Sequence, residues 1–181
     1  TLWDAIEYRQ KNFNEEWQIW ITTDHGREDN GYHHGGQSER ERTTWIATNA
    51  KGLNQYFFKG NPGIVDIMPA MAKHLGVAIP KEKLREVDGV TVTGLLSATD
   101  AKGELQNNTV EISWKPWIKT GNAKVYVSTT NHFKAGGKDK YLLVKQVAVA
   151  RGKVSIDVKN MPSDFYKIVI EFPYNILNSW I

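Results

Sequence analysis

The chain has 181 residues, no cysteine, and a formal charge of +3 from 23 basic and 20 acidic residues. The lack of cysteine excludes disulfides, a thiol nucleophile and thiolate metal sites, so any metal must be held by His and carboxylate side chains. The basic residues are scattered, which argues against binding of a nucleic-acid polymer, and no apolar run approaches the roughly 18 residues of a membrane-spanning helix.

Two elements are predicted at the start of the chain. Leu2, Ile6 and Phe13 fall near helical spacing and predict a helix over residues 2–13. The run 17–23 is aromatic, β-branched and aliphatic, and predicts a short strand buried on both faces. A helix that leads into a buried strand favours an α/β layer, in which ligands gather beyond the carboxyl ends of the strands.

Potential metal ligands follow directly after this strand. Asp24 and His25 lie where the apolar run stops, and His33 and His34 precede a Gly-Gly pair after a polar loop. A carboxylate and imidazoles form the nitrogen-and-oxygen ligand set that zinc prefers. Neighbouring strand residues point to opposite sides, so Asp24 and His25 either lie in a turn or serve two ions of a two-metal site. From these residues alone, an Asp-His pair that merely caps a turn is an equally good interpretation.

The next segments complete the first predicted domain. Residues 26–43 form a long polar loop, of the kind that is usually functional or disordered, and its ERER segment is predicted to be a solvated face rather than a phosphate clamp. Residues 43–48 predict a strand. Apolar side chains at i, i+3, i+4 and i+7 predict an amphipathic helix over residues 64–75, with Gly76 as its end. A charged stretch around residues 80–88 then marks a boundary, which divides the chain into residues 1–84 and 85–181.

Beyond this boundary the hydrophobic period changes from helical to two. Turn residues separate the alternating segments at roughly 8–15 residue spacing, and about seven short strands within ~95 residues predict an immunoglobulin- or fibronectin-III-like β-sandwich over residues 85–181. The clearest segments are 90–94, 110–114, 125–127, 143–147, 154–158 and 168–172. Trp114 is predicted to lie in the sandwich core. For Trp117 and Trp180, core or interdomain packing is favoured over an exposed carbohydrate-binding surface.

Three motifs, in this order, resemble one known family. The segments WITTDHGR, HGGQSERERTTWIATN and GIVDIMPAMAKHLGV are similar to the C-terminal part of the alkaline phosphatase superfamily, in particular its type I phosphodiesterase/nucleotide pyrophosphatase branch. The resemblance covers about residues 1–80. In that family the Asp and His of Asp-His-Gly bind one zinc ion, and a later His before Gly binds the other. The resemblance therefore implies that Asp24 and His25 hold one ion and His34 the other, with His33 belonging to the loop.

The resemblance also implies an incomplete site. The family's Ser or Thr nucleophile, its upstream Asp and its Asp-x-x-x-His pair have no counterpart in the 23 residues before Asp24. We therefore expect the C-terminal portion of a larger enzyme, with no catalytic nucleophile of its own and inactive alone. The parent would be a two-zinc phosphodiesterase, nucleotide pyrophosphatase or phosphatase, acting on phosphate-ester or nucleotide substrates and completed by the upstream half of its α/β domain. Similar chains imply a periplasmic or cell-surface location.

Two other functions stay open. A non-catalytic protein could use the β-sandwich to bind glycan or protein, with the metal motifs retained in a part that does no chemistry. A mononuclear His/Asp metal enzyme such as an oxygenase is a weaker alternative, because its ligands normally lie within one β-barrel, whereas Asp24 and His34 are flanked by an α/β pattern. Upstream sequence with a Ser or Thr nucleophile would favour the hydrolase.

Overall fold

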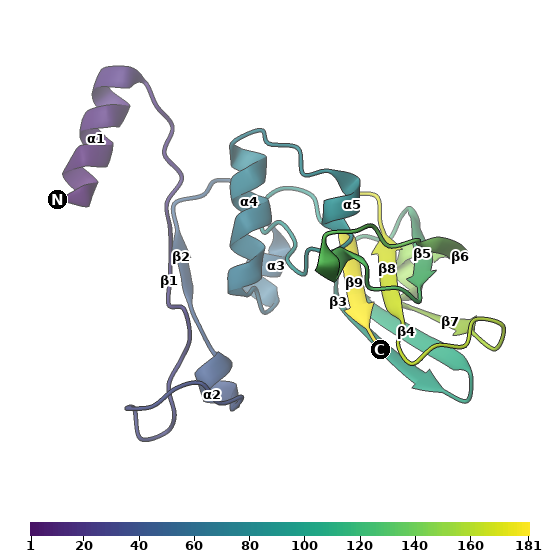
Figure 1. Cartoon of the computed structure of the whole chain (residues 1–181). Helices are drawn as coiled ribbons and strands as arrows, with labels where there is room; N and C mark the ends of the chain where they lie inside the picture. Colours follow the sequence, from purple (N-terminus) through teal and green to yellow (C-terminus); the bar gives the residue numbers. More distant parts are fainter. The chain divides into compact units, whose positions relative to one another are not determined.

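The computed structural model describes residues 1–181, whose contacts gather in two compact units, Thr1–Gly52 and Leu53–Ile181 (Figure 1). The contact division falls after Gly52, so that the segment from α3 to α5 shares a unit with the strands from β3 to β9. The predicted division into an α/β portion over residues 1–84 and a β-sandwich over residues 85–181 stays a prediction. None of the helices combines the length and the apolar character that crossing a membrane requires.

The first unit begins with helix α1 (Leu2–Phe13), which confirms the predicted helix. Its start is stabilised by a capping box, in which the Thr1 hydroxyl accepts from the Asp4 N–H and the Asp4 carboxylate accepts from the Thr1 amino group. It ends at Asn14, which adopts the left-handed conformation. The unit continues with β1 (Trp20–Thr22), α2 (Glu39–Arg42) and β2 (Ile46–Thr48).

Strands β1 and β2 form a two-stranded antiparallel sheet, with Trp20 opposite Thr48 and Thr22 opposite Ile46. The prediction of a strand buried on both faces is wrong for these residues, since the strand is only three residues long and Ile21 is exposed. The physical reason is that each strand of an isolated pair has one neighbour, which leaves too little structure to cover both faces. The α/β assignment, which this antiparallel pair does not test, stays a prediction.

The second unit starts with short helices: α3 (Gln55–Lys59), a 3₁₀ turn (Ile64–Asp66), α4 (Ile67–His74) and α5 (Lys81–Leu84). The turn and α4 together confirm the helix predicted over residues 64–75, and Gly76 follows with a positive φ of 66°. Asp66 is buried and connects these elements, because its carboxylate accepts from Tyr56 Oη, from the N–H of Gly63 and from the N–H of Val90.

The rest of the second unit consists of two antiparallel sheets. One has the order β3-β4-β7 and the other β6-β5-β8-β9. The strands are β3 (Ala98–Gln106), β4 (Thr109–Pro116), β5 (Asn122–Ser128), β6 (Leu142–Ala148), β7 (Lys153–Asp157), β8 (Lys167–Glu171) and β9 (Ile176–Trp180). Between the sheets the buried Trp114 of β4 packs edge-to-face on Phe172, with 5.6 Å between ring centroids. Trp114 is thus a core residue as predicted, whereas the immunoglobulin or fibronectin-III identity stays a prediction.

Two strands were not predicted, and one predicted segment is not a strand. Residues 90–94 contribute only an isolated bridge, from Thr93 to Leu53. The missed strands are β3 and β9. In β3 the alternation is interrupted where the register with β4 shifts between Thr99 and Lys102, and Asp100 there has a positive φ of 58°.

Candidate metal centre

The predicted ligands Asp24 and His25 lie two to three residues beyond the end of β1, on the first unit. The His25 N–H donates to Asp24 Oδ1 at 3.0 Å, which turns the carboxylate toward the imidazole. On the ring, His25 Nδ1 lies 2.6 Å from the carbonyl oxygen of Gly26, and Nε2 lies 3.3 Å from Asp24 Oδ2. The two side chains therefore form a pair in a turn, which is one of the two arrangements that their spacing allows.

These distances fit a metal-binding pair. A carbonyl oxygen can only accept, so Nδ1 carries a proton and the neutral form of His25 presents its lone pair on Nε2. Metal-bound His side chains usually donate their other N–H to a carbonyl or carboxylate in this way. Two ligands of a tetrahedral zinc ion, at roughly 2.0–2.1 Å from the metal, lie about 3.3 Å apart. The Nε2 to Oδ2 separation of 3.3 Å has this value.

The third predicted ligand, His34, lies beside this pair. Its ring centroid is 4.1 Å from that of His25, and the two ring planes are tilted by 35°. The structure thus brings Asp24, His25 and His34 into one neighbourhood, although no three His, Asp or Glu side chains anywhere in the chain surround a common point as ligands of one ion would. His33 is exposed, and its carbonyl oxygen accepts from the Glu28 N–H within the loop.

Glu41 connects the two ligand segments, and sequence reasoning missed it. Its carbonyl oxygen accepts from the Gly26 N–H at 2.7 Å, next to the Asp24–His25 pair. Its carboxylate accepts from the Gly36 N–H at 2.7 Å and from Ser38 Oγ at 2.6 Å, two to four residues beyond His34. The residue is 7% exposed. One glutamate of α2 therefore positions the backbone on both sides of the candidate centre.

Two glycines make this arrangement possible. A Cβ atom on Gly26 would lie 1.9 Å from the Arg40 carbonyl oxygen, and one on Gly36 would lie 2.7 Å from the Glu41 carboxylate. Gly26 therefore needs to lack a side chain because the clash is with backbone, whereas a side chain at Gly36 would have to displace the Glu41 carboxylate from its place.

The signal that could have identified Glu41 is the Ser38-x-x-Glu41 spacing. Ser38 is the N-cap of α2 and Glu41 is its N3 residue, and both halves of a capping box are present. The prediction of a solvated face fails for Glu41, because its carboxylate is turned inward by these bonds. Among the nearby arginines, Arg40 pairs with Asp29 and Arg27 donates to the Tyr32 carbonyl oxygen, so both support the loop.

We expect Glu41→Ala to loosen the loop around His34, because Gly36 and Ser38 lose their acceptor, whereas Glu39→Ala on the exposed side of α2 leaves it unchanged. Amide hydrogen exchange at Gly36 measures this directly. The Ser38 hydroxyl, the Gly36 N–H and the nearby His34 hold the pKa of Glu41 below its ordinary value. The stabilisation is therefore present above the ordinary Glu pKa and is lost as the pH falls through the lowered value. Equal Gly36 exchange in both variants would contradict this role.

Comparison with models of known protein families finds no match to this chain, and neither does comparison with curated proteins. The geometry of the site therefore carries the functional argument.

Proposed function

We propose that Thr1–Gly52 supplies part of the two-metal centre of a phosphoric ester hydrolase, a phosphodiesterase, nucleotide pyrophosphatase or phosphatase. Asp24 and His25 bind one divalent ion, zinc by preference, and His34 binds the other. The proposal assigns the nucleophile and the remaining ligands to residues outside this chain. The α/β identity of the segment and a periplasmic or cell-surface location belong to the same proposal and rest on the resemblance of the three motifs.

One observation carries the proposal. His25 Nε2 and Asp24 Oδ2 are 3.3 Å apart while His25 Nδ1 faces the Gly26 carbonyl oxygen, and this combination is compatible with a zinc-binding pair. A turn cap needs only the bond from the His25 N–H to Asp24 and leaves the ring direction free. The ring of His34, tilted by 35° to that of His25, places a further nitrogen donor beside this pair.

The residues of this chain have different roles in the proposed centre. When bound, the divalent ions supply Lewis-acid stabilisation of phosphate oxygens. Asp24 provides the negative charge of the ligand set, and the Gly26 carbonyl oxygen keeps the lone pair of His25 on Nε2. Glu41 is a positioning residue rather than a ligand, because its carboxylate already accepts from Gly36 and Ser38.

The proposal is tested by hydrolysis of bis(p-nitrophenyl) phosphate, a diester, and p-nitrophenyl phosphate, a monoester. The protein that carries this chain is assayed with zinc added and with zinc chelated, and the 181-residue chain is the matched control. We expect turnover by the longer protein that requires zinc, and none by the chain alone, which should nevertheless bind Co²⁺ in a spectroscopic titration. The preferred ester distinguishes diesterase from monoesterase.

A zinc-loaded longer protein that hydrolyses neither ester faster than the chelated sample would overturn the proposed function. Turnover that is equally fast after chelation would overturn the metal-dependent mechanism. Co²⁺ binding to the chain that persists in His25→Ala would show that the ion is held elsewhere.

A further inference from the structure

The sandwich unit contains a second candidate site, a hollow of about 520 Å³. Its walls include two aromatic rings, two amides, two carboxylates and one ammonium group, which belong to Phe133, Trp180, Asn131, Asn178, Glu86, Asp88 and Lys134. The volume lies within the roughly 300–1,000 Å³ that is usual for small-molecule sites. The mixture of aromatic and amide side chains already distinguishes it from a purely apolar groove.

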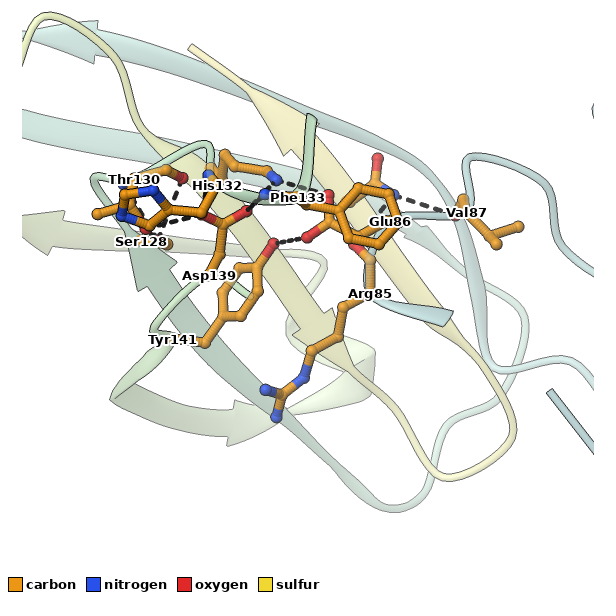
Figure 2. A network of polar contacts seen from close by, with 11 residues as sticks. Arg85, Glu86, Val87, Ser128, Thr130, His132, Phe133, Asp139 and Tyr141 are labelled. Carbon is orange, nitrogen blue, oxygen red and sulfur yellow. Dashed lines mark hydrogen bonds and ion pairs between the residues drawn. The ribbon is translucent and has the colours of Figure 1, made fainter. Parts of the chain in front are cut away.

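One wall is held rigidly by Asp139. Its Oδ1 accepts from Thr130 Oγ1 at 2.8 Å and from the His132 N–H at 2.7 Å (Figure 2). Its Oδ2 accepts from Lys167 Nζ at 2.7 Å. These bonds fix the loop that follows β5, on which Asn131 and Phe133 lie. Because the loop is ordered in advance, binding of a ligand there costs little conformational entropy.

The opposite wall is held as firmly. Asn178 Nδ2 donates to the carbonyl oxygens of Arg85 and Val87, which fixes the segment after α5 against β9. Asn178 and Trp180 are two residues apart on β9 and so lie on the same face of the strand. Both walls of the hollow are therefore held in place by hydrogen bonds.

The charges at the base of the hollow are already paired. Lys167 is 1% exposed and contacts Glu86 Oε2 at 2.5 Å and Asp139 Oδ2 at 2.7 Å, while Tyr141 Oη also donates to Glu86. Lys167 balances only one of its two carboxylate partners, so one negative charge stays in excess at the base. Beside it the hollow presents aromatic surface and amide groups to a ligand, together with the exposed and oppositely charged side chains of Asp88 and Lys134.

Two features of the hollow leave groups available to a ligand. Trp180 is 53% exposed although Lys167 Nζ lies over its ring, 4.8 Å from the centroid. Since Lys167 is buried, it covers the inner face of the indole and leaves the outer face open. Asn131 Oδ1 is buried and has no hydrogen-bond partner, the one such side-chain atom in the chain. Buried polar atoms of this kind are rare, and each calls for a reason.

From this arrangement we infer that the hollow binds a sugar residue of a glycan. The apolar CH face of a pyranose ring stacks on the open face of Trp180, and its hydroxyl groups donate to the amide oxygens of Asn131 and Asn178, since the Asn178 amide nitrogen already donates to Arg85 and Val87. A hydroxyl donor would satisfy Asn131 Oδ1 once the side chain turns toward the hollow, because this atom is closed to solvent in the absence of a ligand. The inference goes beyond the proposed hydrolase and does not depend on it, because all of its residues lie in Leu53–Ile181.

Saturation-transfer NMR of the 181-residue chain with the methyl glycosides of glucose, galactose, mannose and N-acetylglucosamine tests the inference. We expect millimolar binding of at least one glycoside, weakened at least ~5-fold in Trp180→Ala through loss of stacking and restored in Trp180→Phe. Asn131→Ala should weaken binding without lowering the unfolding temperature, because the amide oxygen has no partner to lose. Trp45→Ala is the matched control, since Trp45 is also 53% exposed but lies in the other unit.

Absence of binding by the unsubstituted chain to all four glycosides would overturn the inference. So would undiminished binding by both Trp180→Ala and Asn131→Ala. If Trp45→Ala weakened binding as much as Trp180→Ala, the sugar would be meeting exposed tryptophans in general, and the hollow would not be its site.

Discussion

Replacing Asp24 or His34 by alanine should lower zinc-dependent hydrolysis of the preferred phosphate ester by at least ~100-fold in the longer hydrolase that we propose. Each substitution removes one ligand from a different ion of the proposed centre. Because the proposed mechanism needs both ions, weakened binding of either ion should be enough to lower turnover. Steady-state kinetics with zinc at saturating and limiting concentrations measure the loss. Partial recovery of Asp24→Ala at high zinc would show that the ligand acts through metal affinity.

His33→Ala is the matched control for this result. His33 precedes His34 directly and is exposed, and its recorded bond to Glu28 is made by its carbonyl oxygen, which alanine retains. We expect its turnover to stay close to that of the unsubstituted protein. Loss of turnover in His33→Ala together with full turnover in His34→Ala would show that His33, and not His34, is the ligand. Full turnover in Asp24→Ala would show that the Asp24 carboxylate is not a ligand.

Lys167→Ala should destabilise the unit Leu53–Ile181 by about 3–5 kcal/mol, because it leaves two carboxylates buried without their cation. Glu86 and Asp139 both pair with this one lysine, and their side chains are 6% and 0% exposed. Chemical denaturation of the 181-residue chain, monitored through tryptophan fluorescence, measures the change in the free energy of unfolding. Lys145→Ala is the control, since its exposed amine donates only to the Ser155 carbonyl oxygen and its loss should cost less than ~0.5 kcal/mol.

Neutralising the two acids tests the reason for this loss. In a Lys167→Met background, Glu86→Gln with Asp139→Asn should restore part of the stability, because the unpaired buried charges are then removed. No recovery would mean that Lys167 acts through packing rather than through its charge.

The same network predicts an acid dependence. Burial raises the pKa of Asp139, but the donors Lys167 and Thr130 outweigh it and lower the pKa to about 2. Because the pKa in the folded state is below the ordinary value of 3.8, this stabilisation is complete above that value and is lost as the pH falls toward 2. The decrease in the free energy of unfolding at low pH should be smaller in Lys167→Ala, because Asp139 then lacks its cationic donor.

The hydrophobic pattern of a segment predicts its secondary structure correctly where that pattern depends only on residues within the segment. Helix α1 and the helix over residues 64–74 lie where apolar spacing places them, because helical periodicity depends on residues three and four apart. Strands β4, β5, β6, β7 and β8 coincide with alternating segments. Strand β3 was missed because its alternation is broken at the irregular pairing around Asp100, a feature that exists only against β4.

In the candidate centre, too, some features can be predicted from the sequence and others cannot. Asp24, His25 and His34 could be named from residue type and motif order, since ligand chemistry belongs to single side chains. Their proximity could not be derived from the sequence, because it depends on the path of the loop between His25 and His34, which brings the two rings together. Glu41 escaped notice for this reason: its role comes from the Gly26 N–H, 15 residues earlier in the chain, and from a carboxylate turned inward instead of outward.

The sequence by itself determined which residues form helices and strands over most of the chain, and which side chains have the chemistry of metal ligands. Only the tertiary structure decided that β1 and β2 pair as an exposed antiparallel ribbon, that Lys167 is buried between two acids, and that Trp180 presents an open face above it. The reason is sequence separation: Lys167 meets Asp139 and Glu86 across 28 and 81 residues. Contacts over such distances are set by the packing of whole sheets, which no local period records.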